Sequence, residues 1–349
     1  MPMRIHLALH CNQGDAILAP DYCEEHPLGG TATAVLKMAQ CLKQLGADVT
    51  VSTTSDQVPA TPTDVFVIAR QWGNFAKGIR PGKLNYLWCH DDPDQPVFNG
   101  MKEPGVAARV YENCDGLIMV SHYQAMRWLA GMAAPADKLF ISSNGIDLAR
   151  FQVNRAQLIR REPRAYYAST PFRGLDNLLE LWPIVRKVVG ERAKLTICSS
   201  LQVYGVTENP ECEALYVKAR QMDGVEYLGS VGQRQLREVA ASCRALAYPC
   251  TFAETSCIAA MEAIASGCVV VGTELGALPE TAWRNPLVPL AGDWGDRWIE
   301  ELLRVLVDNR YYGMVAEENL KLAELMGWQS VARKWLMRFQ SDLVKKASG

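Results

Sequence analysis

Two glutamates eight residues apart, Glu254 and Glu262, have a side-chain type and spacing that indicate binding chemistry. The sequence from 256 to 265 predicts a helix, which places Glu254 just before its start and Glu262 about two turns inside it. A rise of roughly 1.5 Å per residue separates the two carboxylates by about 12 Å along the helix axis. Carboxylates accept hydrogen bonds well from hydroxyl groups, so the pair suits a ligand with hydroxyls at both ends.

The beginning of this predicted helix suits a negatively charged group. Its first N–H groups have no partner within the helix and its dipole is positive there, which favours a phosphate. A nucleotide-diphosphate sugar has the matching length, with its sugar near one glutamate and its ribose near the other. The alternative is that Glu254 only complements the helix dipole and that Glu262 is a solvated helix residue. Spacing alone does not separate these two interpretations.

The segments around the two glutamates must then form the edge of a sheet. Apolar runs at 245–248 and 268–272 predict buried strands on either side of the helix, which Ser266 and Gly267 end. Strand–helix–strand units build parallel sheets, and ligands bind beyond the carboxyl ends of their strands. Further strands are predicted at 5–9, 49–52, 65–69, 84–89, 116–120, 137–144, 164–168 and 195–199, and another begins at 225 and ends before Gly229. Helices are predicted at 30–45, 124–130, 175–189, 211–222, 235–242, 294–309, 312–325 and 328–343.

Composition limits the class of protein. The chain has 349 residues, 49% of them hydrophobic and 21% charged, which is typical of a globular protein with two domains. A net charge of −2 gives no electrostatic case for nucleic acid. The eleven cysteines include no C-x2-C pair, so we expect reduced thiols and a cytoplasmic location. The apolar run at 3–9 is too short for a signal peptide, and no run reaches membrane-spanning length.

The pattern E-x7-E, followed by AIASGCVVV and LPE, resembles the donor-binding signature of the GT-B glycosyltransferases of family 4. The resemblance implies that Glu254 contacts the donor sugar and Glu262 the ribose. The family usually has an aromatic residue and a glycine soon after the first glutamate, where this chain has Ser256 and Cys257. Donor contacts through the backbone survive such a change, and we expect them at Thr255, Ser256, Cys257 and Ile258.

Three further segments are similar to the same family. The segment NGID-x3-F at 144–151 resembles the one that closes the family's first domain. Gly29 and Gly30 would on their own indicate a tight turn, but their place between a strand and a helix resembles the family's N-terminal glycine loop. The resemblance also implies that the backbone from Gly229 to Val231 contacts the nucleobase.

His90 and Arg173 complete the predicted site. His90 follows a strand directly, where a lone histidine is more often structural; the resemblance implies that it faces the donor sugar from the first domain. Arg173 occupies the family's Lys-Gly position on the donor diphosphate. The family's other arginine is replaced by the Ser169-Thr170 region, so backbone donors must stabilise more of the charge. The predicted catalytic residues are therefore His90, Arg173 and Glu254.

No metal site is predicted. Asp91 and Asp92 are adjacent, so their carboxylates point apart in an extended chain, and no third ligand lies nearby in the sequence. The resemblance likewise implies a reaction without an essential metal or other cofactor.

The predicted fold is α/β, with two Rossmann-like domains facing across a cleft. The predicted bounds are 1–152 for the first domain and 163–325 for the second. The resemblance implies that the first is the acceptor-side domain, that the second is the donor domain, and that 326–349 form a helix that returns to the first domain. The resemblance implies a retaining glycosyltransferase that uses a nucleotide-diphosphate sugar, with a UDP-sugar favoured. The alternatives are a non-catalytic sugar-nucleotide-binding protein and another GT-B enzyme, such as a sugar-phosphate synthase or a phosphorylase.

The acceptor is expected to be a glycan or a lipid-linked saccharide. Two tryptophans with neighbouring basic residues would suit a peripheral contact with the inner face of a membrane, and ordinary surface and core positions are the alternative. The residues concerned are Trp72, Trp128, Lys77, Arg80 and Arg127.

Overall fold

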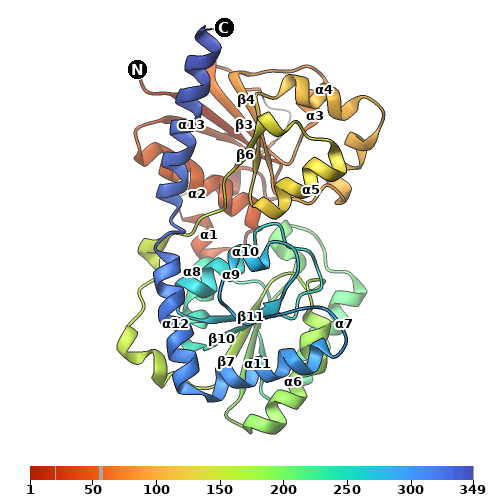
Figure 1. The fold of residues 1–349 in the computed structure, drawn as a ribbon, viewed down its shortest axis with the longest axis vertical. Helices are drawn as coiled ribbons and strands as arrows, with labels where there is room; N and C mark the ends of the chain where they lie inside the picture. Colours follow the sequence, from red (N-terminus) through yellow and green to blue (C-terminus); the bar gives the residue numbers. More distant parts are fainter. Residues whose placement is uncertain (20, 55–57, 349) are drawn as a thin grey trace. The chain divides into compact units, whose positions relative to one another are not determined.

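The computed structural model describes residues 1–19, 21–54 and 58–348 and contains two parallel six-stranded sheets, each accompanied by helices (Figure 1). The chain divides into two compact units. The first comprises Met1–Pro20, Gly29–Gly145 and Gly327–Gly349, and the second comprises Asp21–Leu28 and Ile146–Met326. The predicted α/β class is confirmed.

The sheet of the first unit has the strand order β2-β1-β3-β4-β5-β6. Its central strands are buried along almost their whole length, as in parallel sheets covered on both faces. The strands are β1 (Arg4–Ala8), β2 (Asp48–Ser52), β3 (Thr63–Ala69), β4 (Gly82–Cys89), β5 (Gly116–Met119) and β6 (Leu139–Ile141). The helices are α2 (Gly30–Gln44), α3 (Gly73–Ala76), α4 (Val106–Asn113), α5 (His122–Met132) and α13 (Trp328–Ser348).

The last helix, α13, packs within the first unit, against α2 and β4. Trp335 is fully buried, and its indole N–H donates to Ser142 Oγ at 2.8 Å. The Tyr86 hydroxyl donates to Asp342 Oδ2 at 2.5 Å. The prediction that the last helix returns to the first domain is confirmed, and the helix continues five residues beyond the predicted end at 343.

The sheet of the second unit has the strand order β12-β11-β10-β7-β8-β9. The strands are β7 (Arg164–Ala168), β8 (Lys194–Cys198), β9 (Val225–Tyr227), β10 (Ala245–Ala247), β11 (Val269–Thr273) and β12 (Leu287–Val288). The helices are α6 (Leu175–Val189), α7 (Pro210–Gln221), α8 (Gln233–Ser242), α9 (Ile258–Ala265), α10 (Leu278–Thr281), α11 (Trp294–Val307) and α12 (Asn309–Ala323). The predicted helix at 175–189 is observed with the same bounds.

Two left-handed residues mark the ends of elements near the predicted site. Strand β9 ends at Tyr227, before Gly229 as predicted, and Gly229 adopts a left-handed φ of +70°. Helix α9 begins at Ile258 rather than at 256, because Cys257 is also left-handed, with a φ of +61°. Residues other than glycine seldom adopt this conformation.

The segment before α2, where no helix or strand is predicted, contains two short helical elements: a 3-10 helix, Gly14–Leu18, and α1 (Tyr22–Glu25). Helix α1 packs against α8 in the second unit. Glu24 is 1% exposed and forms ion pairs with Arg237 at 2.5 Å and Arg150 at 3.2 Å. Both partners are more than a hundred residues away in sequence, so local patterns gave no sign of this helix.

Candidate functional site

The site is built where two loops of the second unit touch at the carboxyl ends of β7 and β10. Asn177 Nδ2 donates to the Pro249 carbonyl at 3.2 Å, and Ala277 N donates to the Glu254 carbonyl at 2.7 Å. A Cβ atom at Gly174 would lie 2.2 Å from the Pro249 carbonyl oxygen, and one at Gly276 2.4 Å from that of Glu254. Only glycine fits such approaches, so these two positions fix the loops around Glu254.

Arg173 and Glu254 form an ion pair between the two loops. Arg173 Nη1 donates to Glu254 Oε1 at 3.0 Å and to Oε2 at 3.2 Å. The Tyr248 hydroxyl donates to the same Oε1 at 2.5 Å and lies 3.2 Å from Ser169 Oγ. Glu254 is 3% exposed, so its negative charge is buried and is balanced mainly by Arg173.

The Arg173 guanidinium also packs against two aromatic rings that contact each other. It lies 4.7 Å from the ring centroid of Phe252 and 5.6 Å from that of Phe172. Burial opposes the charge on Arg173, but the neighbouring Glu254 carboxylate holds the pKa of Arg173 well above its usual value. Arg173 is therefore a permanent cation at this edge of the sheet.

Three buried hydrogen-bond donors in this region have no hydrogen-bond partner within the described residues. They are Arg173 Nε, Thr170 Oγ1 and Ser199 Oγ. Thr170 and Ser199 follow the neighbouring parallel strands β7 and β8, which are in register at Ala168 and Cys198. Unpartnered buried donors are uncommon and call for a physical explanation, and a ligand rich in acceptor oxygens would provide one.

The other predicted residues of the second unit lie on segments other than the two loops that form the Arg173–Glu254 pair, or further along them. Glu262 is partly buried on α9. Burial, followed by Cys268 and Glu262, raises the pKa of Tyr166 on β7. Ser256 is buried, and its carbonyl accepts a bond from Thr281 Oγ1 at 2.5 Å. Gly229 and Val231 lie in the loop between β9 and α8, and Thr255, Cys257 and Ile258 lie in the turn that begins α9.

In the first unit, His90 follows β4 and packs on Trp88, with ring centroids 4.5 Å apart. Burial, with a smaller effect of the charge on Arg70, lowers the pKa of His90 to about 3. Its imidazole is therefore neutral at physiological pH. Gly29 has an extended conformation as the N-cap of α2, and Gly30 is the first residue of that helix.

The two aspartates after His90 are engaged by arginines. Arg70 binds Asp91 with contacts of 2.5 and 3.2 Å. Arg127 binds Asp92 at 3.0 and 3.1 Å. Across residues 1–19, 21–54 and 58–348, no group of three His, Cys, Asp or Glu side chains is arranged to hold a metal ion. Over the same ranges, no helix is long and apolar enough to cross a membrane.

Sequence reasoning missed Tyr248, which it treated only as the last residue of a strand. A tyrosine at the end of a buried strand is a usable signal, because a buried phenol needs a hydrogen-bond partner. It also missed the Arg173–Glu254 contact, since the two residues are 81 positions apart.

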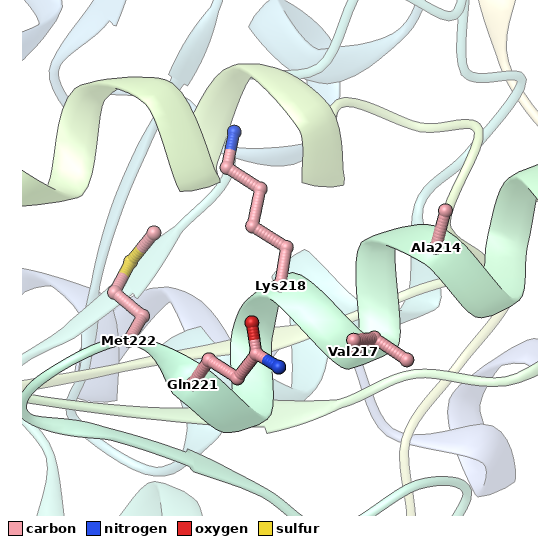
Figure 2. Close-up of a pocket in the computed structure, with 5 residues that line it drawn as sticks. All are labelled: Ala214, Val217, Lys218, Gln221 and Met222. Carbon is pink, nitrogen blue, oxygen red and sulfur yellow. The ribbon is translucent and has the colours of Figure 1, made fainter.

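A separate surface hollow of about 450 Å³ lies along α7 (Figure 2). It is lined by Ala214, Val217, Lys218, Gln221 and Met222 and contains none of the predicted site residues.

Comparisons with known proteins agree with this architecture. The structure of Anabaena Alr3699/HepE in complex with UDP and glucose has a TM-score of 0.72 and 13% identity, covering 97% of this chain and all of that one. Sucrose-phosphate synthase from Thermosynechococcus elongatus has a TM-score of 0.71 and 16% identity, covering 97% and 98%. At these identities the likeness concerns the fold, and the fold is GT-B.

Residues 165–308 match the family model described as Glycosyl transferases group 1. The MMP alpha-(1->4)-mannosyltransferase of Mycolicibacterium hassiacum is 25% identical over 245 residues, 69% of this chain. That match spans 57% of the relative's own length. The family match covers residues 165–308, which lie in the second unit, and agrees with the resemblance that the sequence motifs indicate.

Proposed function

We propose that this protein is a retaining glycosyltransferase that moves a sugar from a nucleotide-diphosphate sugar to a glycan or lipid-linked acceptor, without an essential metal. The observation that carries the proposal is the buried Arg173–Glu254 pair at the carboxyl ends of parallel strands, where Arg173 Nε, Thr170 Oγ1 and Ser199 Oγ have no hydrogen-bond partner within the described residues. Ligands of open α/β sheets bind at that edge.

The chemistry of these groups matches the parts of such a donor. Diphosphate oxygens are acceptors, and Arg173, Thr170 and Ser199 offer buried donors. Sugar hydroxyls donate to carboxylates, which is the role proposed for Glu254, while Glu262 accepts from the ribose. The start of α9 adds the positive end of a helix dipole. The backbone of Gly29, Gly30 and of the segment 229–231 completes the proposed donor contacts.

The proposed reaction needs positioning and charge stabilisation rather than a protein nucleophile. The acceptor hydroxyl attacks the anomeric carbon from the face that the diphosphate leaves, and a leaving phosphate oxygen takes the hydroxyl proton. Negative charge grows on the diphosphate as the glycosidic bond breaks, so fixed donors aimed there lower the barrier. His90, being neutral, would contribute a hydrogen bond to the sugar and not a charge.

UDP-sugars are the first donors to test, because the similar HepE structure contains UDP and glucose. The mannosyltransferase relative makes a mannosyl donor the second. Calorimetry with UDP, GDP and ADP, followed by donor hydrolysis and transfer assays with EDTA present, tests the proposal. We expect binding of one nucleotide, slow hydrolysis of its sugar conjugate, and a product with the anomeric configuration of the donor. Binding without turnover would favour the non-catalytic sugar-nucleotide-binding alternative.

A further inference from the structure

The Tyr248 side chain is held rigidly next to Glu254. Tyr248 is fully buried directly after β10, and its backbone N–H donates to the Val271 carbonyl at 2.8 Å. Its ring packs on that of Tyr167, with centroids 5.8 Å apart. The hydroxyl reaches Glu254 Oε1 at 2.5 Å, which is the short distance expected when a carboxylate accepts from a hydroxyl.

The direction of this hydrogen-bond chain follows from the groups in it. An ionised carboxylate only accepts, so the Tyr248 hydroxyl donates to Glu254. The same hydroxyl then accepts from Ser169 Oγ, 3.2 Å away. Burial, followed by the charge of Glu254, raises the pKa of Tyr248 well above its usual value. The phenol therefore keeps its proton and remains a donor throughout the neutral pH range.

The contacts leave one part of the carboxylate available. Oε1 accepts from both Tyr248 and Arg173, whereas Oε2 accepts from Arg173 at 3.2 Å. Each carboxylate oxygen has two acceptor positions, so Oε2 retains one for a ligand hydroxyl. Tyr248 and Arg173 together fix the plane of the carboxylate and hence the direction of that remaining position.

We propose that Tyr248 is a positioning residue, which orients Glu254 so that Oε2 accepts a hydrogen bond from one hydroxyl of the donor sugar. This inference rests on the proposed function. It also gives a role to Ser169, which lies where the resembled family has a second arginine: its hydroxyl forms a hydrogen bond with the Tyr248 hydroxyl. Tyr248 thereby determines how strictly the configuration at that sugar hydroxyl is recognised.

The test uses Tyr248→Phe, which keeps the ring and removes only the hydroxyl. We expect UDP affinity to stay within about twofold of wild type, because the proposed partner of Glu254 is the sugar and not the nucleotide. The donor kcat/KM should fall about tenfold or more, the usual consequence of losing a hydrogen bond to a charged group. Selectivity between UDP-glucose and UDP-galactose, which differ in one hydroxyl configuration, should fall towards unity.

The matched control is Tyr312→Phe, which also removes a buried phenol hydroxyl. That hydroxyl donates to the Gly267 carbonyl at 3.2 Å and is not part of the Tyr248–Glu254–Arg173 cluster. This control should leave kcat/KM and donor selectivity unchanged. Ser169→Ala, which removes only the outer hydrogen bond, should shift both quantities in the same direction as Tyr248→Phe but less. It keeps the test decisive if Tyr248→Phe does not fold.

Two outcomes overturn the proposal. One is a folded Tyr248→Phe variant with wild-type kcat/KM and selectivity. The other is an equal loss of UDP affinity and turnover, which would indicate a structural role. The proposed function fails separately, if the wild-type protein binds and turns over no sugar nucleotide.

Discussion

At the scale of single residues, Arg173 and Glu254 depend on each other. A carboxylate that is 3% exposed is stable as an anion only when its charge is matched and hydrogen-bonded. Tyr248 contributes a neutral donor and Arg173 the opposite charge. A variant at either end of the pair therefore changes both stability and the affinity for a charged ligand, and the two effects must be measured separately.

The first prediction concerns Arg173. Arg173→Ala should lower kcat by on the order of a hundredfold, because a fixed donor to the leaving diphosphate acts mainly in the transition state. It should also lower the free energy of unfolding, because Glu254 loses its counter-charge. Arg173→Lys should restore part of both, since it keeps the charge and loses the planar fork. Steady-state kinetics below the melting temperature of each variant check this; an unchanged kcat would exclude Arg173 from the site.

The second prediction separates the two glutamates. Glu262→Ala should weaken free nucleotide binding by about 1.5–3 kcal/mol, the usual loss for a hydrogen bond to a charged group. Glu254→Gln should leave free nucleotide affinity nearly unchanged and reduce transfer, because its proposed partner is the sugar. Calorimetry with the nucleotide alone measures both. Equal losses in the two variants would contradict the assignment of ribose to one glutamate and sugar to the other.

The third prediction concerns the protonation of His90. Burial lowers its folded-state pKa to about 3, whereas an unfolded histidine titrates near about 6.5. As the pH falls from about 6.5 to 3, the unfolded state takes up a proton that the folded state does not, so His90 makes the protein less stable in acid. NMR should show no titration of the His90 ring between pH 5 and 8, and a normal titration after denaturation.

His90→Ala tests the role of the same side chain in turnover. The nucleotide dissociation constant should stay within a few-fold of wild type, while hydrolysis and transfer lose most of their rate. Wild-type turnover in this variant would make His90 purely structural.

At the scale of elements, the loop between β10 and α9 is shaped by a residue in an unfavourable conformation. Cys257, at a φ of +61°, directly precedes the first residue of α9. The left-handed conformation costs roughly 1–2 kcal/mol for residues with a Cβ. The resemblance described in the sequence analysis implies that glycine is usual here, and the left-handed backbone gives the physical reason.

The fourth prediction follows from this conformation. Cys257→Gly should be more stable than Cys257→Ala by about 1 kcal/mol, the reverse of the order inside a helix. Comparing the two variants with each other cancels the loss of the buried thiol. Chemical denaturation measures the difference. A more stable alanine variant would show that the backbone relaxes out of the left-handed region.

At the scale of the whole molecule, most of the fold was predictable from sequence because strands and helices alternate with clear periodicity. Helix α6 was predicted with its observed bounds, and α13 was placed correctly against the first unit. Contacts between residues far apart in sequence were not predictable. Arg173 reaches Glu254 across 81 positions, and Glu24 reaches Arg237 across 213 positions, so no local pattern marks either contact.

The fifth prediction concerns Glu24. Glu24→Ala should lower the free energy of unfolding by about 3 kcal/mol, because Arg150 and Arg237 would lose a buried carboxylate. Glu25→Ala is the matched control, since the adjacent Glu25 pairs with Arg234 where both side chains are more than half exposed. Exposed pairs contribute about 0–1 kcal/mol. Equal melting temperatures for the two variants would contradict the prediction.

The placement of α1 also limits how this protein can be recombined with a relative. Because residues 21–28 pack with residues 146–326, the second unit is assembled from two separate stretches of the chain. A hybrid joined once, near residue 146, would take its second sheet from one parent and the partner of Arg150 and Arg237 from the other. The guanidinium groups of Arg150 and Arg237 would then contact residues 21–28 of the other parent. Moving the second unit intact between relatives therefore requires two inherited pieces, the large one and an eight-residue one.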